Sequence, residues 1–331
     1  MKNVKRMRKY LFYLSGENEK LAKAEVEFLL KSYSKFRLIE EDKQILVCEG
    51  NGNIKRLALT HEACEFVTSC EIDDLEDVFR SLEYPKTKIC VRVKNVGGKK
   101  LDAAKAEREL GAILWKRGAE VSVSNPEAII KVYLANKAFV GFLIQKTDTK
   151  QFLIRKPTNK PFFMPNVVLP RFARALVNLS GVRENEVLLD PMCGTGTFLI
   201  EAGLMNIEIL GIDPFEKIVS GCRENLRYYG LKANVLMGDA KKLPFKDNSI
   251  DAIVTDFPYL QSTKSFGSLM DLYYKATEEF SRVLKSKRFA VIVSNIDFDE
   301  LLGNYFKIVG KFYQRIHKNL TRRIYLCLKD Y

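Results

Sequence analysis

The second half of this chain alternates short apolar runs with stretches of helical periodicity, and no other feature constrains its fold as strongly. Apolar runs of strand length recur after about residue 166, and helical stretches separate most of them. Strands are predicted at Val187–Asp190, Ile207–Asp213, Asn234–Gly238, Ile250–Asp256 and Arg288–Ser294, and helices at Thr197–Leu204, Glu216–Tyr229 and Met270–Leu284. This order predicts an α/β fold with a parallel sheet and helices on both faces. Two final apolar runs, Tyr305–Tyr313 and Arg322–Leu328, predict a closing hairpin.

The first half of the chain has shorter elements and predicts two small α+β units. Residues 1–65 follow a β-α-β-β-α-β order, with helices at 17–30 and 54–64, which is typical of a ferredoxin-like domain. Residues 66–147 form the second predicted unit, with strands at 88–93, 129–134 and 138–145 and a helix at 102–117. A polar, basic and proline-containing stretch at 148–165 is the predicted linker to the domain at 166–331.

The charge of the chain is strongly positive and unevenly distributed. The 331 residues carry a net charge of +13, and three runs (1–16, 149–183 and 301–329) contain Lys and Arg without any acid. These runs favour contact with a polyanion, although each could also be a solvated face. Seven cysteines without a Cys-x-x-Cys pair and only two histidines argue against a metal site and fit a reducing cytoplasm. No apolar run reaches membrane-spanning length, so no membrane partner is expected.

A glycine turn follows the first predicted strand of the second half and opens its first helix. Gly194-Thr195-Gly196 lacks the third glycine of a dinucleotide fingerprint, and no Gly-Lys-Ser/Thr follows it. Asp190 would repel a pyrophosphate but suits a cation such as the α-amino group of S-adenosylmethionine. The alternative is a plain tight turn. The predicted cofactor-binding residues here are Asp190, Pro191, Cys193, Gly194, Thr195, Gly196 and Thr197.

Acidic residues stand at the ends of four successive predicted strands. Asp213 could accept both ribose hydroxyls of the cofactor, and Asp239 with Ala240 could receive the adenine amine. Asp256 ends the fourth strand and completes the predicted cofactor set. Each acid alone could cap a helix. Four of them favour a ligand site, because ligands of open α/β sheets bind outside the carboxyl ends of the strands.

The tetrapeptide Asp256-Phe257-Pro258-Tyr259 resembles the [Asp/Asn]-Pro-Pro-[Tyr/Phe] motif of amino-group methyltransferases. In that family the acid or amide and the following carbonyl hold the target amine, and the aromatic ring stacks on the base. The resemblance implies that Asp256, Pro258 and Tyr259 are catalytic and that Phe257 and Tyr259 contact substrate. Phe257 departs from the usual proline, and a simple turn is the alternative. The loop 261–264 could close over the base or be a surface loop.

A wider resemblance covers nearly the whole chain. Arg155-Lys156-Pro157, Pro161-Phe162 and residues 169–180 resemble the segment before the first motif of archaeal and eukaryal tRNA guanosine-10 N2-methyltransferases. Residues 110–113, 118–121 and 125–128 resemble the core of the THUMP RNA-binding domain. The family implies a seven-stranded Rossmann-like catalytic domain, S-adenosylmethionine as cofactor and tRNA as partner. It also implies RNA contacts from Arg155, Arg171 and Arg174, and some members need a small zinc-binding activator subunit.

Other functions compete with this interpretation. A THUMP enzyme acting on guanosine 6 of tRNA would share the domain plan, and an N6-adenine methyltransferase of DNA or rRNA would share the tetrapeptide. The THUMP-like half argues against DNA. An RNA-binding protein with a degenerate methyltransferase domain is the main alternative that is not an enzyme. An NAD-dependent dehydrogenase is disfavoured by the incomplete glycine pattern.

Overall fold

The computed structural model describes residues 7–97, 101–165, 167–232, 234–259, 266–318 and 320–330. The chain divides into two compact units. The first comprises residues 1–23, 34–55 and 59–147, and the second comprises 24–33, 56–58 and 148–331. Within the described residues, no helix is both long enough and apolar enough to cross a membrane.

The first unit is built on one seven-stranded sheet in the order β2-β3-β1-β4-β7-β6-β5. Its strands are β1 (Arg8–Leu14), β2 (Arg37–Asp42), β3 (Ile45–Gly50), β4 (Thr60–Cys70), β5 (Ile89–Asn95), β6 (Ala128–Leu134) and β7 (Ala138–Lys146). Its helices are α2 (Leu75–Ser81), α3 (Ala103–Lys116) and the first residues of α1 (Glu19–Tyr33). Because β4 pairs with β7, the strands predicted for two separate domains join one sheet. The predicted domain bounds and names stay predictions.

One helix predicted in the first half is wrong. Residues 54–64 contain only a single 3-10 turn, Ile54–Arg56, and β4 begins at Thr60. The reason is tertiary, since β4 pairs along β1 on one side and β7 on the other. Ladder hydrogen bonds and burial there outweigh the helical preference of the segment. Helix α2 was not predicted, whereas the helix at 102–117 and the strands at 88–93, 129–134 and 138–145 are confirmed.

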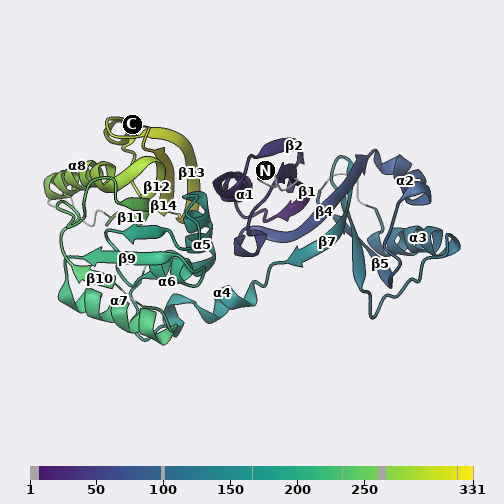
Figure 1. Cartoon of the computed structure of the whole chain (residues 1–331), viewed down its shortest axis with the longest axis horizontal. Coiled ribbons are helices and arrows are strands. Elements are labelled where there is room, and N and C mark those ends of the chain that lie inside the picture. The colour runs from purple at the N-terminus through teal and green to yellow at the C-terminus, as the bar shows by residue number, and fades with distance from the viewer. Residues whose placement is uncertain are drawn as a thin grey trace, which may run out of the picture. The chain divides into compact units, whose positions relative to one another are not determined.

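The second unit contains a seven-stranded sheet in the order β10-β9-β8-β11-β12-β14-β13 (Figure 1). Its strands are β8 (Val187–Asp190), β9 (Glu208–Asp213), β10 (Asn234–Met237), β11 (Ile250–Asp256), β12 (Leu284–Ser294), β13 (Lys307–His317) and β14 (Leu320–Leu328). All pair in parallel except β14, which is antiparallel to both β12 and β13. The predicted α/β fold and closing hairpin are therefore confirmed. The strand order reverses between β8 and β11, which is where such sheets bind ligands.

Helices cover both faces of this sheet. The helices of the second unit, besides the end of α1, are α4 (Lys150–Ile154), α5 (Pro170–Leu179), α6 (Thr197–Gly203), α7 (Glu216–Tyr228), α8 (Phe266–Val283) and α9 (Asp299–Gly303). Figure 1 shows α6 and α7 on one side of the strands and α8 on the other. Apolar residues of α8, among them Tyr273 and Phe280, pack with β11, β12 and β14 in one buried cluster. The helix that follows the glycine turn, α6, is itself almost wholly buried.

A buried ion triad fixes α6 beneath the glycine turn. Glu201 of α6 is 1% exposed and binds two guanidinium groups. Arg155 Nε donates to its Oε1 at 2.7 Å, and Arg174 Nε donates to its Oε2 at 2.9 Å. Arg155 and Arg174 are buried, so the expectation that they face RNA is wrong. The physical reason is the carboxylate of Glu201, which must be paired because an isolated buried charge is costly.

The third arginine of that prediction also has a partner inside the second unit. Arg171 Nε donates to the backbone carbonyl of Ala58 at 2.9 Å, and the side chain is half-buried. A contact between Arg171 and RNA stays a prediction.

Replacing Glu201 by Gln should destabilise the protein, because two buried guanidinium groups would lose their shared countercharge. Removing one partner of a buried ion pair costs about 3–5 kcal/mol. The matched control is Glu208→Gln, at an exposed position that begins β9. Urea unfolding followed by circular dichroism measures both. Equal unfolding free energies for the two variants would contradict a structural role for the triad.

Candidate active site

The glycine turn leaves an open surface at one residue and is tightly packed at the others. Gly194 and Gly196 have φ angles of +49° and +80°, in the left-handed region that favours glycine. A Cβ on Gly196 would lie 2.7 Å from the Cys222 Sγ, whereas a Cβ on Gly194 would meet nothing within 4 Å. The backbone of Gly194 can therefore approach a ligand. Five further residues of the predicted cofactor set are buried around it, namely Pro191, Cys193, Thr195, Gly196 and Thr197.

Asp190 is a buried carboxyl group that lacks a cationic partner among the described residues. It ends β8 and is 1% exposed. Burial raises the pKa of Asp190 to about 8, and the nearby acids Asp213 and Asp256 add to this rise. The Thr255 hydroxyl and the Met192 N–H only partly offset it. A ligand cation placed here would relieve this repulsion, so the site favours an ammonium group.

Asp213 lies beside Asp190 at the end of the neighbouring strand, β9. Its two carboxylate oxygens accept the backbone N–H groups of Gly194 and Phe215, each at 3.2 Å. Burial nevertheless raises its pKa. Each carboxylate oxygen can accept a second hydrogen bond, so Asp213 keeps capacity for ribose hydroxyls. It also ties the glycine turn to the adjacent strand.

Asp239 differs from the other strand-end acids because it lies beyond the end of β10 and its side chain is 53% exposed. Lys241 Nζ stands 3.6 Å from its carboxylate. The following residue, Ala240, is buried in the core cluster. The structure thus brings Asp190, Asp213 and Asp256 close together and leaves Asp239 at the rim. Its predicted contact with adenine stays a prediction.

These residues fit S-adenosylmethionine. A buried carboxylate offers a counterion to an α-amino group, the open Gly194 backbone admits a ligand, and Asp213 offers acceptors to a ribose. No group of three or more His, Cys, Asp or Glu among the described residues could hold a metal ion.

Asp256 ends β11 on the other side of the switch point, and its carboxyl group is held in a small polar network. Tyr259 donates its hydroxyl hydrogen to the Asp256 oxygens, at 2.8 and 3.1 Å. The Asp256 side chain is 20% exposed, so a substrate can reach it. Burial raises the pKa of Asp256 to about 6, while the charge of Arg322 and the hydrogen bond from Tyr259 work in the opposite direction. Pro258 is exposed beside it.

Arg322 is a member of this network that sequence reasoning did not single out. Its side chain, from β14, is 4% exposed. Its Nε donates to the Tyr259 hydroxyl at 2.7 Å and lies 3.6 Å from the Asp256 carboxylate. The available signal was its position at the start of the last apolar run, opposite the end of β12. The basic run 301–329 that contains it predicts instead a contact with a polyanion or a solvated face.

The Phe257 side chain is buried in the core, and a substrate contact through its backbone carbonyl stays a prediction. The residue is 1% exposed, and its ring centroid lies 4.2 Å from that of Tyr273 and 5.6 Å from that of Phe298. Apolar burial explains the position, since the ring anchors the tetrapeptide in the core of the α8 face. The Tyr273 hydroxyl also donates to the Pro258 carbonyl at 2.8 Å. The loop 261–264 lies outside the described residues.

Comparison with known proteins gives a consistent result. A family model described as the RMKL-like methyltransferase domain matches residues 157–324. A tRNA (guanine(10)-N2)-dimethyltransferase of Pyrococcus abyssi is 36% identical and covers 96% of this chain and 99% of its own length. A protein of that name from Methanothermobacter thermautotrophicus is 33% identical, covering 94% of this chain and 96% of its own. The crystal structure of TrmN from Thermus thermophilus has a TM-score of 0.53 at 19% identity, covering 97% and 99%, which shows a shared fold.

The raised pKa of Asp190 predicts that cofactor affinity depends on pH. The carboxylate form pairs with an ammonium group, and this form becomes populated as pH rises toward about 8. The association constant for S-adenosylmethionine should therefore rise between pH 5.5 and 7.5, approaching tenfold per pH unit. Calorimetry at fixed ionic strength measures this. Asp190→Asn should bind more weakly and lose the slope; an equal slope in both proteins would contradict the assignment.

Proposed function

Because this chain belongs to the family of RMKL-like methyltransferases, together with the tRNA (guanine(10)-N2)-dimethyltransferases, we propose that it methylates the exocyclic N2 of guanosine 10 in tRNA. S-adenosylmethionine is the methyl donor. The observation that supports the proposal most strongly is the position of the accessible Asp256 carboxyl at the switch point, beside the cluster of Asp190 and Asp213.

The chemistry needs alignment more than activation. The lone pair of guanine N2 is delocalised into the ring and is a poor nucleophile. When bound, S-adenosylmethionine supplies a methyl group that is already activated by its sulfonium sulfur. Asp256 accepts hydrogen bonds from the amine and orients N2 toward the methyl carbon at near-attack distance. As positive charge develops on N2, the same carboxylate stabilises it and receives a proton.

Tyr259 and Arg322 hold Asp256 in place for this role. A carboxylate offers about four acceptor positions, so Asp256 can take the amine hydrogens while it keeps the Tyr259 hydroxyl. Arg322 fixes that hydroxyl and favours the ionised form of Asp256. The ring of Tyr259 also offers a face for a base that has left its helix.

Two methyl transfers are compatible with this arrangement. After the first transfer, N2 still carries one hydrogen that Asp256 can accept, so the product can return as substrate. We propose N2-methylguanosine and N2,N2-dimethylguanosine as successive products. We also propose that the reaction takes place in the cytoplasm. A small activator subunit stays a prediction of the family resemblance, which copurification tests.

The proposed function predicts that guanosine is the only nucleoside modified, and only at position 10. Unmodified tRNA transcripts treated with the enzyme and S-adenosylmethionine should yield methylated and dimethylated guanosine by mass spectrometry, lost when guanosine 10 is replaced by adenosine. Asp256→Ala should retain cofactor binding and lose turnover by about a thousandfold. Product at guanosine 6, or methylated adenosine, would contradict the proposal.

Arg322→Gln should shift the pH profile of the reaction. Without the guanidinium charge the pKa of Asp256 rises further above its wild-type value of about 6. Because the ionised carboxylate is the working form, activity should fall at pH 6–7 and recover at higher pH. The profile of kcat under saturating RNA measures this, with Arg322→Lys expected to lie closer to the wild type. An unchanged acidic limb in Arg322→Gln would contradict this role.

A further inference from the structure

The second unit contains a cationic pocket at the amino-terminal ends of its strands, whereas the active site lies at their carboxyl ends. The volume of the pocket is about 250 Å³. It lies where β8, β11 and β12 begin, whereas Asp190 and Asp256 stand where strands end. The polar residues that line it are Lys31, Ser32, Ser180, Arg183, Lys287 and Arg288. Phe28 and Phe289 meet edge to face at its apolar wall, with ring centroids 5.3 Å apart.

A bulge in β12 carries the central cations of this pocket. Ile250 of β11 pairs with Leu284, and Ala252 pairs with Phe289, so β12 holds three extra residues between these pairs. Between these pairs β12 has four residues, Lys285-Ser286-Lys287-Arg288, opposite the single residue Asp251 of β11. Lys287 has a φ angle of +58°, which is unusual for a residue with a side chain and costs free energy. Strained bulges of this kind re-aim side chains and recur at functional sites.

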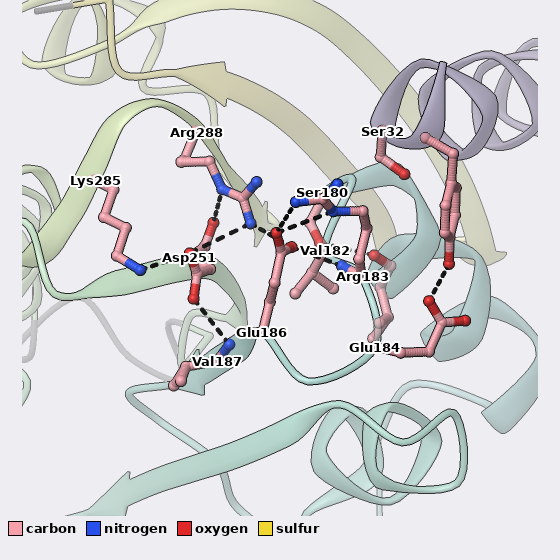
Figure 2. A network of polar contacts seen from close by, with 12 residues as sticks. Ser32, Ser180, Val182, Arg183, Glu184, Glu186, Val187, Asp251, Lys285 and Arg288 are labelled. Carbon is pink, nitrogen blue, oxygen red and sulfur yellow. Dashed lines mark hydrogen bonds and ion pairs between the residues drawn. The ribbon is translucent and has the colours of Figure 1, made fainter. Parts of the chain in front are cut away.

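Carboxylates hold part of this charge in place but do not neutralise it. Glu186 is shared by Arg183 and Arg288, and Asp251 binds Lys285 at 2.7 Å and accepts a longer contact from Arg288 at 3.5 Å (Figure 2). Lys31 pairs with Glu27. The cationic side chains in and beside the pocket thus outnumber the carboxylates by two. The cations are Lys31, Arg183, Lys285, Lys287 and Arg288, and the carboxylates are Glu27, Glu186 and Asp251. No acidic residue lines the pocket, and Lys287 is exposed with no carboxylate in ion-pair range among the described residues.

The Arg183–Glu186–Arg288 cluster is preorganised for an anion. Burial raises the pKa of Glu186, but hydrogen bonds from Arg288 and Arg183 outweigh it and lower the value to about 2. Glu186 therefore stays charged and fixes both guanidinium groups. In Figure 2 the contacts of Arg288 engage Nε and one terminal nitrogen, and the other terminal nitrogen carries no drawn contact. Guanidinium and ammonium groups bind phosphate through their N–H donors.

We propose that this pocket binds a backbone phosphate of the RNA substrate. Along β11 the pocket lies roughly 16 Å from Asp256, at 3.3 Å per residue. A phosphate held here would fix the register of the RNA at a second point, away from the base that reacts. The inference rests on the proposed RNA substrate.

The test measures tRNA binding against salt concentration for the full chain. Lys287→Asn removes the free cation, and Asn tolerates the left-handed backbone, so the variant keeps its fold. Losing one phosphate contact should weaken binding about fivefold to tenfold at 0.1 M salt and lower the salt slope by about 0.9. The double variant Arg183→Gln/Lys287→Asn should lower the tRNA affinity and the salt slope further. Lys232→Asn, at an exposed lysine after α7, is the matched control and should leave both unchanged.

Calorimetric titration with S-adenosylmethionine should give one affinity for the wild type and all variants, which shows that the fold is retained. Unchanged tRNA affinity and salt slope in the double variant would overturn the proposal. So would stabilisation of the wild type alone by inorganic phosphate with unaltered tRNA binding, since the pocket would then serve a small anion. Failure of the wild type to methylate tRNA, with the variants still weaker in RNA binding, would count against the proposed function and support the pocket.

Discussion

Burial of carboxyl groups at neighbouring strand ends is the constraint on which the active site depends. Three strands, β8, β9 and β11, end at Asp190, Asp213 and Asp256, which are partly or wholly withdrawn from water. The charges of Asp213 and Asp256 add to the rise in the pKa of Asp190. Such a cluster is unfavourable without a cation. The fold sustains it because a parallel sheet brings the carboxyl ends of its strands to one edge. Binding of a cationic methyl donor therefore relieves an electrostatic cost that is built into the folded chain.

The two acids at the switch point are supported differently, which suits two roles. Asp190 has neutral neighbours, the Thr255 hydroxyl and the Met192 N–H, and its pKa rises to about 8. Asp256 has Arg322 and Tyr259 beside it, and its pKa rises only to about 6. Near neutral pH this difference leaves Asp256 ionised and ready to hold an amine. Asp190 becomes fully charged when a positive ligand group arrives.

The sequence predicts the parts of this site that follow from strand periodicity. The four acids were identified because each ends an apolar run, and the turn at Gly194 because two glycines follow the first run. Contacts between segments that are distant in the sequence could not be predicted from periodicity. Arg155 and Arg174 look like surface cations until Glu201 is found between them. Arg322 reaches Asp256 only because the last hairpin returns next to β12. Phe257 replaces a proline and packs as a core residue.

Positive charge in this chain accordingly has two uses. Some of the basic residues, such as Arg155, Arg174 and Arg322, are interior groups that orient carboxylates. Others, such as Lys287 in the strained bulge of β12, remain exposed and are available to a polyanion. Counting basic residues along the sequence cannot separate these classes, because pairing is decided by the fold.

A crystal structure with an inert analogue of S-adenosylmethionine tests the central claim most directly. During the reaction the guanine N2 must lie within hydrogen-bond distance of Asp256 and at near-attack distance from the methyl carbon of the cofactor. The analogue's transferable position should therefore lie no more than roughly 6.5 Å from the nearest Asp256 oxygen, with its amino group on Asp190. A transferable position well beyond that distance, or one with no space for a purine beside Asp256, would contradict the account.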